Sequence, residues 1–325
     1  MVGDRILPQL LNRFGLARGV SILMYHSVVD ADLPFRNWCV LSAETFRAHV
    51  EFLKCYADVI PLSAVGKRLA QPSKARPAVV ITFDDGYRNN FDVAFPILKD
   101  AGLPATVFLT TGLIGTKEML WDSRLYLAIA SARNPSIRWD GVNYTLTGAQ
   151  EKAHCFTALK AWLKPFAQDQ FEEKLGQIIG QLDTDRDGYN GLSRSFEMLW
   201  PEQVTEMVDS GLIEFGGHTH SHSILERLDQ AERRHEIETS VREVARLTCR
   251  PCRSFAYPNG KREDYTTDCL DVLRDCGVEV AVTTVEQPAT GSSDLLELGR
   301  YPVGVGTGLT RLRLKVFQLE QFLRR

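Results

Sequence analysis

The stretch VVITFDDGYRNN, Val79 to Asn90, decides the fold. The run VVITF is apolar or β-branched throughout, which is typical of a strand buried on both faces. Two adjacent carboxylates, Asp84 and Asp85, follow at once, and Gly86 then permits a tight turn. A surface turn is the ordinary interpretation of an isolated Asp-Asp-Gly. The alternative is a site at the end of a buried strand, where one carboxylate binds a divalent cation and its neighbour stays ionised in the field of that cation.

Further apolar segments alternate with segments of helical periodicity. The predicted strands cover 21–29, 78–83, 105–112, 213–218, 254–258 and 278–284. One predicted helix begins after Ser42 as the N-cap, and another has Pro201 in its first turn and Gly211 just past its end. Near-continuous apolar strands separated by helices predict a parallel sheet covered by helices, in either a βα barrel or an open doubly wound sheet.

One region, about 118–200, interrupts this alternation. From Trp121 to Trp200 the chain has little strand signal and much helical signal, as in AQEKAHCFTALKAWLKPFAQDQFEEKLGQIIGQL. We interpret the region as a helical insertion on one βα loop of a single domain spanning 1–325. Loops at the carboxyl ends of strands are where such folds build their sites.

Composition excludes several classes of protein. The chain has 325 residues, 44% of them hydrophobic and 24% charged, which is typical of a soluble globular protein. The formal charge of −3 gives no general attraction to nucleic acid. No run of 18 apolar residues predicts a membrane span, and the N-terminus lacks the pattern of a secretory signal.

Cysteine content and the chain ends bear on localisation. Seven cysteines, an odd number in a chain of this size, favour reduced thiols and a cytoplasmic protein. Both chain ends, Leu7–Arg18 and Leu309–Arg325, combine apolar and basic residues. That pattern fits packing against the rest of the fold, or a peripheral membrane contact.

A second polar cluster changes the interpretation of the two carboxylates. GGHTHSHS, Gly216 to Ser223, holds His218, His220 and His222 directly after an apolar segment. On one helical turn, His218 and His222 would share a face and could share a metal ion, while His220 would point elsewhere. Two histidines and one aspartate give three protein ligands with open positions, which is the arrangement of a catalytic rather than a structural zinc site.

These motifs together resemble those of the polysaccharide deacetylases with a NodB-like domain. The first family motif stands here as Thr82-Phe83-Asp84-Asp85-Gly86, and the second, H-[ST]-x-x-H, as His218-Thr219-His220-Ser221-His222; FAYPNG matches a third. The resemblance implies a distorted (β/α) barrel and hydrolysis of an N-acetyl group from an amino sugar.

The resemblance also implies residue roles. Asp85, His218 and His222 would be the metal ligands and Asp84 the general base, and the backbone N–H of Asn259, the residue after the motif proline, would stabilise the oxyanion.

The sequence departs from the usual family pattern at two positions. No histidine follows His235, so the general acid of most members has no counterpart there. A circularly permuted subset of the family carries the corresponding strand at the N-terminus, which makes His26 the candidate acid; a strand-end histidine bonded to backbone is the alternative. Ala256 stands where many members carry an arginine that pairs with the base, and Arg300 could substitute for it or be merely an exposed arginine.

We therefore expect a metal-dependent hydrolase, with Zn²⁺ as the expected ion, that removes N-acetyl groups from amino sugars of a polysaccharide or glycan precursor. Exopolysaccharide biosynthesis is the expected setting, and an N-acetylated sugar or oligosaccharide the expected partner. The alternatives are a deformylase or amide hydrolase acting on a lipid-linked amino sugar, and a catalytically silent glycan-binding module on the same fold. Replacing Asp84 with Asn is expected to abolish turnover and to leave the metal bound.

Overall fold

The computed structural model describes residues 19–71, 76–166, 168–184 and 191–319. The apolar, basic segment 7–18 and the last residues of the basic C-terminal segment, 320–325, lie outside the described residues, so the predicted membrane contact at these ends stays a prediction. Within the described ranges, no helix combines the length and the apolar character needed to cross a membrane.

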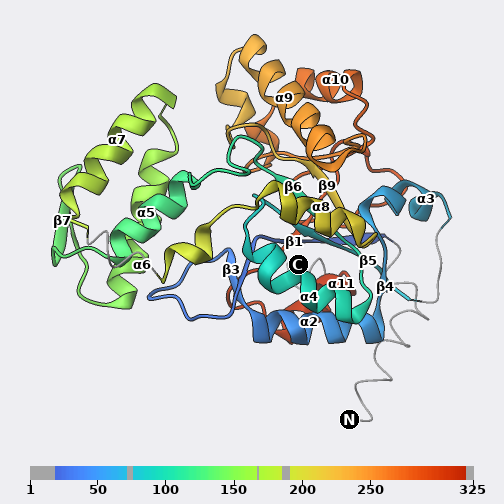
Figure 1. Cartoon of the computed structure of the whole chain (residues 1–325), viewed down its shortest axis with the longest axis horizontal. Helices are drawn as coiled ribbons and strands as arrows, with labels where there is room; N and C mark the ends of the chain where they lie inside the picture. The colour runs from blue at the N-terminus through green and yellow to red at the C-terminus, as the bar shows by residue number, and fades with distance from the viewer. Residues whose placement is uncertain (1–18, 72–75, 167, 185–190, 320–325) are drawn as a thin grey trace.

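The centre of the molecule is a parallel β-sheet that curves into a distorted barrel (Figure 1). Seven strands follow one another in the order β11-β10-β9-β6-β5-β1-β12, and β4 also pairs with β5. Their bounds are β1 (Val20–Tyr25), β4 (Asp58–Val59), β5 (Ala78–Phe83), β6 (Ala105–Leu109), β9 (Ile213–Gly217), β10 (Ser254–Ala256), β11 (Val280–Val282) and β12 (Tyr301–Pro302). Every pairing in this sheet is parallel, as the near-continuous apolar strands predict.

One short segment connects the two edges of the sheet. Leu298 forms a parallel bridge with Val282 of β11, and three residues later Tyr301 pairs with Leu23 of β1. Between these two contacts lies Arg300, which is therefore held at the seam of the barrel.

Helices cover the outside of the sheet. They are α2 (Ala43–Tyr56), α3 (Val65–Ala70), α4 (Phe95–Ala101), α8 (Pro201–Asp209), α9 (Gln230–Thr248), α10 (Thr267–Asp275) and α11 (Leu309–Val316). The predicted caps are confirmed: the Ser42 side chain accepts a hydrogen bond from the Thr45 N–H, and Pro201 begins α8. Figure 1 shows α2, α4 and α11 grouped on one side of the sheet and α9 and α10 on the other.

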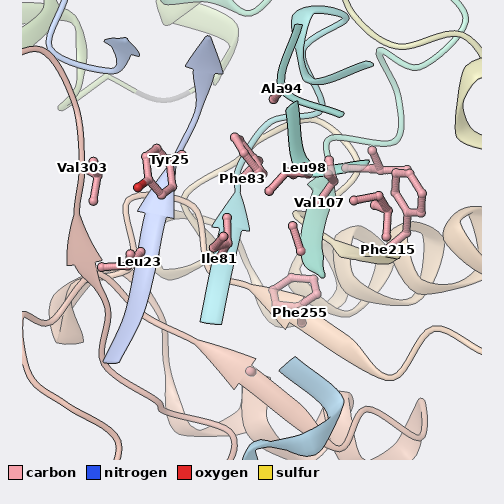
Figure 2. Packing of buried hydrophobic residues seen from close by; sticks show 14 of the residues in the cluster. Leu23, Tyr25, Ile81, Phe83, Ala94, Leu98, Val107, Phe215, Phe255 and Val303 are labelled. Atoms are coloured by element: carbon pink, nitrogen blue, oxygen red, sulfur yellow. The ribbon is translucent and has the colours of Figure 1, made fainter. Parts of the chain in front are cut away.

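Alternation along the strands separates two apolar clusters. In β1 and β5, the odd-numbered residues, such as Leu23 and Ile81, pack against the helices (Figure 2). The even-numbered residues, such as Ile22 and Val80, belong to a separate cluster with Phe108, which we assign to the barrel interior. Both strands are buried at every residue, so each face contributes to the hydrophobic core.

The same alternation brings polar groups to the end of the barrel. Continuing the even-numbered series past Ile22 and Val80 leads to His26 and Asp84, and continuing from Leu298 leads to Arg300. Three side chains that lie far apart in the sequence are thus directed by strand geometry toward one place.

The region 121–182 forms a separate helical body on one βα connection. It consists of α5 (Trp121–Ala130), α6 (Ala149–Leu163), α7 (Gln168–Gln181) and an antiparallel hairpin of β7 (Ser136–Trp139) and β8 (Val142–Thr145). The helices have a hydrophobic cluster of their own, which includes Leu125, Leu159 and Leu175, and Figure 1 shows them projecting from one side of the barrel. The hairpin was not predicted, because its short strands are exposed or half-buried at every residue except Ile137 and carry no continuous apolar run.

The predicted continuous strand 21–29 is wrong. Strand β1 ends at Tyr25, and β2 (Ser27–Val29) pairs with β3 (Val40–Ser42) in a small sheet of its own. His26 lies at the break between the two, where Asn90 Nδ2 donates to its carbonyl oxygen at 2.7 Å. The break places His26 at the carboxyl end of β1, at the mouth of the barrel.

Candidate active site

Asp84 and Arg300 form a buried, bidentate ion pair at the carboxyl end of the barrel. Nη1 and Nη2 of Arg300 donate to the two carboxylate oxygens at 2.6 and 2.7 Å. The guanidinium is itself held by the Thr283 carbonyl oxygen at 2.9 Å and the Thr82 hydroxyl at 3.2 Å, and its exposed fraction is 0%. This fork-to-fork geometry fixes the orientation of the carboxylate as well as its charge.

The ion pair sets the protonation state of Asp84. Burial alone would raise the pKa of this carboxyl, but Arg300, with smaller contributions from His218 and His26, outweighs burial and lowers the pKa. The Asp84 carboxylate is therefore ionised although it is buried, so it can accept a proton. The alternative of an exposed Arg300 is therefore wrong, and Arg300 makes the contact with the carboxylate that a substitute for an arginine at position 256 would make.

Asp85, His218 and His222 converge on one point. Asp85 Oδ1 lies 3.5 Å from His218 Nε2 and 3.3 Å from His222 Nε2, and one donor atom from each of the three residues lies within 4.8 Å of the others. Burial would raise the pKa of Asp85, but its interactions with the two imidazoles hold that pKa well below its usual range. Asp85 correspondingly raises the pKa of His222 against the effect of burial.

The backbone route to this convergence differs from the predicted one. Residues 218–222 form no helical turn; Thr219 and His222 have left-handed φ angles of 61° and 64°. Asp85 also has a positive φ, 77°, so the chain reverses direction directly after the strand. The helical spacing argument is therefore wrong, although the two imidazoles still lie side by side, edge to face, with ring centroids 5.0 Å apart and an interplanar angle of 71°.

The three residues fit a divalent cation. Asp85 Oδ1 is buried and makes no hydrogen bond of acceptable geometry within the described part of the chain. His218 Nδ1 lies 2.7 Å from the Ala256 carbonyl oxygen, which fixes the tautomer with the other nitrogen, Nε2, free to bind a metal. One carboxylate and two imidazoles are the donor set of catalytic zinc sites, which keep open positions.

His26 lies beside the carboxylates. Its Nε2 is 3.9 Å from Asp84 Oδ2, and its Nδ1 is buried with no hydrogen-bond partner among the described residues. Burial lowers the pKa of His26, and the nearby carboxylates Asp85 and Asp84 oppose that effect. The structure thus brings His26 to the same end of the barrel as the metal-ligand candidates.

Asn259 follows β10 on the rim of the same site. It has a φ of 56° and lies at the centre of a tight turn in which the Gly260 N–H donates to the Pro258 carbonyl oxygen at 2.6 Å. The Thr284 hydroxyl donates to the Asn259 carbonyl oxygen, which restricts the orientation of the following peptide. Asn259 lines the cleft described next.

All of these groups except Arg300 open into one cleft of about 1300 Å³ between the barrel and the helical body. The helical body supplies one wall, and the segments that follow β9 and β10 supply the other. The first wall includes Trp121, Asp122, Lys160, Lys164 and Phe171; the second includes Ile224, Arg227, Lys261 and Asp264.

Reasoning from the sequence missed two residues of the site. Glu236, on α9, accepts the backbone N–H groups of His220 and Ser221 at 2.7 and 2.9 Å, so it anchors the loop between the two histidines. Trp38 lines the cleft beside His26. An aromatic residue in the segment after the first strand end is the only sequence signal that could have pointed to Trp38.

The comparison with protein families agrees with this geometry. The family model described as polysaccharide deacetylase matches residues 71–281, which is more than half of the chain. The chain belongs to the polysaccharide deacetylase family. The match includes Asp84, Asp85 and the histidine loop and excludes His26 and Arg300, which lie on either side of it.

Two curated relatives of this family match over shorter stretches. The chain is 33% identical to "Putative polysaccharide deacetylase YxkH" of Bacillus subtilis (strain 168) over 108 residues, which are 33% of this chain and 37% of the relative. It is 32% identical over 91 residues to the poly-β-1,6-N-acetyl-D-glucosamine N-deacetylase of Staphylococcus epidermidis, covering 28% of this chain and 31% of the relative. The chain thus matches about a third of the length of these relatives.

Solved structures of similar fold cover nearly the whole chain. The Streptococcus pyogenes deacetylase PplD, in complex with acetate, superposes with a TM-score of 0.60 and 20% identity over 92% of this chain and 98% of its own. IcaB from Ammonifex degensii gives a TM-score of 0.59 and 19% identity over 92% and 97%. At these identities the likeness establishes the deacetylase-type barrel fold, in agreement with the predicted distorted (β/α) barrel.

Proposed function

We propose that this protein is a metal-dependent hydrolase that removes N-acetyl groups from amino sugars of a polysaccharide or glycan precursor. One observation carries the proposal: three donor atoms, from Asp85, His218 and His222, converge next to a buried, ionised carboxylate that is not itself one of them. A pure binding module has no need of an ionised carboxylate buried beside a metal-ligand cluster, since burying that charge is costly. Membership of the deacetylase family, and the N-deacetylase named among its relatives, support the choice of bond.

A divalent cation bound at Asp85, His218 and His222, with Zn²⁺ as the expected ion, would polarise the acetyl carbonyl and lower the pKa of a water molecule at its open position. Asp84 then accepts the proton from the attacking water, and its bidentate bond to Arg300 keeps the carboxylate aligned throughout the reaction. Arg300 is a positioning residue here, because it is fully buried and acts through Asp84.

The remaining steps concern the leaving group and the oxyanion. His26 Nε2, which lies 3.9 Å from Asp84 Oδ2, donates a proton to the leaving amine. The backbone N–H of Asn259 donates to the developing oxyanion, an interaction of the kind that accounts for a large share of catalysis in acyl transfer. The products are acetate and the free amino sugar; transfer of the proton from Asp84 to His26, 3.9 Å away, returns both groups to their starting states, so water is the only co-reactant.

The test begins with elemental analysis of the purified protein, followed by a screen for release of free amine from N-acetylated amino sugars and their oligomers. We expect one divalent cation per chain, and amine and acetate in equal amounts. A chelator should abolish the release, and the added metal should restore it.

Each alternative has its own result. Formate in place of acetate would identify a deformylase. Absence of any amine with every metal tried, combined with retained affinity for oligosaccharides, would identify a glycan-binding module and overturn the proposal.

A further inference from the structure

Trp38 presents an indole to the cleft beside the proposed acid. Its exposed fraction is 47%, and it lines the cleft together with Asp84 and the metal-ligand candidates. The indole meets the His26 ring nearly edge-on, with centroids 5.1 Å apart and an interplanar angle of 76°. Tryptophan offers a large apolar ring and is enriched at binding surfaces, so an exposed indole beside the proposed reaction centre is a candidate contact for the substrate.

The indole stands on a fixed backbone. The Val305 N–H donates to the Trp38 carbonyl oxygen at 2.9 Å, and the neighbouring residues Asn37 and Cys39 are both buried. Gly304 lies so close that a Cβ atom there would come within 1.8 Å of the Trp38 carbonyl oxygen. The exposure of Trp38 therefore belongs to a packed segment, and the indole is a preformed surface.

The chemistry of the proposed reaction says which part of the substrate lies beside Trp38. The leaving amine is attached to the sugar ring, so the group that protonates this amine has to stand beside that ring. His26 is that group, and Trp38 is the aromatic neighbour of His26 on the cleft. Sugar rings carry an apolar face of C–H groups that packs well on an aromatic plane.

We propose that the Trp38 indole is the binding platform for the pyranose ring that carries the reacting amide. The inference rests on the proposed function and deepens it by assigning the sugar side of the cleft. The cleft, at about 1300 Å³, exceeds the roughly 300–1000 Å³ typical of sites for drug-sized ligands, which fits an oligosaccharide whose further rings extend along the walls.

Trp121 is less suited to this role although it also lines the cleft. Its ring packs against Phe171 at 4.9 Å, and Lys160 Nζ lies 5.7 Å from its ring centroid. Its contacts are thus largely internal to the helical body, whereas Trp38 has the exposed face.

The test compares Trp38→Ala and Trp38→Phe with a matched control, Trp200→Ala. Trp200 has a similar exposed fraction, 38%, and does not line the cleft. Each metal-loaded variant is assayed with a tetramer of N-acetylglucosamine and with 4-nitrophenyl acetate, a small acetyl ester without a sugar ring. For the tetramer we expect Trp38→Ala to raise KM about tenfold with kcat within about twofold, and Trp38→Phe to stay within about threefold of the parent.

The ester separates sugar binding from damage to the site. Trp38→Ala should lose much less kcat/KM on the ester than on the tetramer, because the ester has no ring to bind. Equal losses on both substrates, a fall in kcat alone, or a result equal to that of Trp200→Ala would each overturn the inference.

A binding measurement keeps the inference separate from the proposed function. In the Asp84→Asn background, titration calorimetry with the tetramer should show a Kd about tenfold weaker when Trp38 is also replaced by Ala. That result would sustain the platform even if the parent protein released no amine. An unchanged Kd would overturn it even if the parent protein were fully active.

Discussion

The barrel rim and the helical body face each other across one cleft, yet they are built by different rules. On the rim, each reacting side chain follows a strand end, and left-handed backbone at Asp85, Thr219 and His222 aims the side chains inward. In the helical body, α5, α6 and α7 close over their own hydrophobic cluster, and their polar residues reach the cleft only as its wall. The comparison separates residues that perform the chemistry from residues that shape what can enter, and substitutions on the two sides should differ accordingly.

The largest difference is expected between two aspartates on opposite sides of the cleft. Asp84→Asn removes the proposed base, so amine release should fall about 10³-fold while the metal content stays near one per chain. Asp122→Asn, on the helical body, removes the partner of Lys160 at 2.7 Å and should cost less than about tenfold, since that ion pair is partly exposed. Both are measured by steady-state amine release with elemental analysis of the same samples. More than a tenth of parental activity in Asp84→Asn would exclude Asp84 as the base.

Ion pairs on the two sides should differ in stability as well. Arg300→Met leaves Asp84 ionised and buried without its partner, so the free energy of unfolding should fall by about 3–5 kcal/mol. Lys160→Met breaks the partly exposed pair with Asp122 and should cost about 1 kcal/mol or less. Urea denaturation measures the free energy of unfolding of both variants. Equal losses would show that the Asp84–Arg300 pair contributes no more to stability than the Asp122–Lys160 pair.

The sequence predicts much of the rim and little of the wall. Asp84, Asp85 and the histidine loop stand in contiguous motifs at the ends of apolar strands, so local pattern and residue type suffice to bring them to one edge. The strand alternation that directs His26 and Arg300 into the barrel is also written in the sequence, but using it requires the strand bounds and the pairing order. Nothing local indicates that the segment with Arg300 closes the seam between β11 and β1.

The features that the sequence did not predict depend on tertiary contacts, which produce no hydrophobic periodicity in the sequence. The spacing of His218 and His222 predicts a helical turn, but the structure has left-handed residues at Thr219 and His222. Either backbone path brings the two imidazoles to the same side of the segment. The hairpin β7–β8 and the position of Trp38 are set by packing against distant segments, such as 304–305 for Trp38. The insertion was predicted from its helical periodicity at about 118–200, whereas its hydrophobic cluster also draws in Phe35 and Val40 from outside that range.

The core of the helical body should be separable from the metal site. Leu159 is almost fully buried in its cluster, so Leu159→Ala should lower the free energy of unfolding by about 3 kcal/mol through the cavity that it leaves. Metal affinity should be unchanged, because none of the ligand candidates belongs to this cluster. Amide hydrogen exchange should show the loss of protection confined to α5–α7. Loss of metal along with stability would show instead that the rim depends on the helical body.

The smallest effect is expected at Glu236, on α9. This residue is neither a proposed catalytic group nor part of the helical body, but it anchors the loop between the two histidines. Its carboxylate accepts the N–H groups of His220 and Ser221, and the Ser221 hydroxyl at 2.7 Å. Glu236→Ala should weaken metal affinity about tenfold, because partners of ligand-bearing segments typically contribute 10–100-fold to affinity. Competition with a chromogenic chelator measures this affinity directly.

Glu243, on the same helix, provides the matched control for Glu236. It pairs with Arg246 at 2.8 Å on the helix surface, so Glu243→Ala removes the same charge from α9 without touching the histidine loop. Glu236→Gln should restore most of the affinity, because an amide oxygen can still accept both backbone N–H groups while its NH₂ group donates to the Ser221 hydroxyl. If Glu236→Ala and Glu243→Ala bind metal equally well, the histidine loop keeps its left-handed turns without Glu236. The strand ends would then fix the loop, together with the hydrogen bond from the Gly112 N–H to the His220 carbonyl oxygen at 2.7 Å.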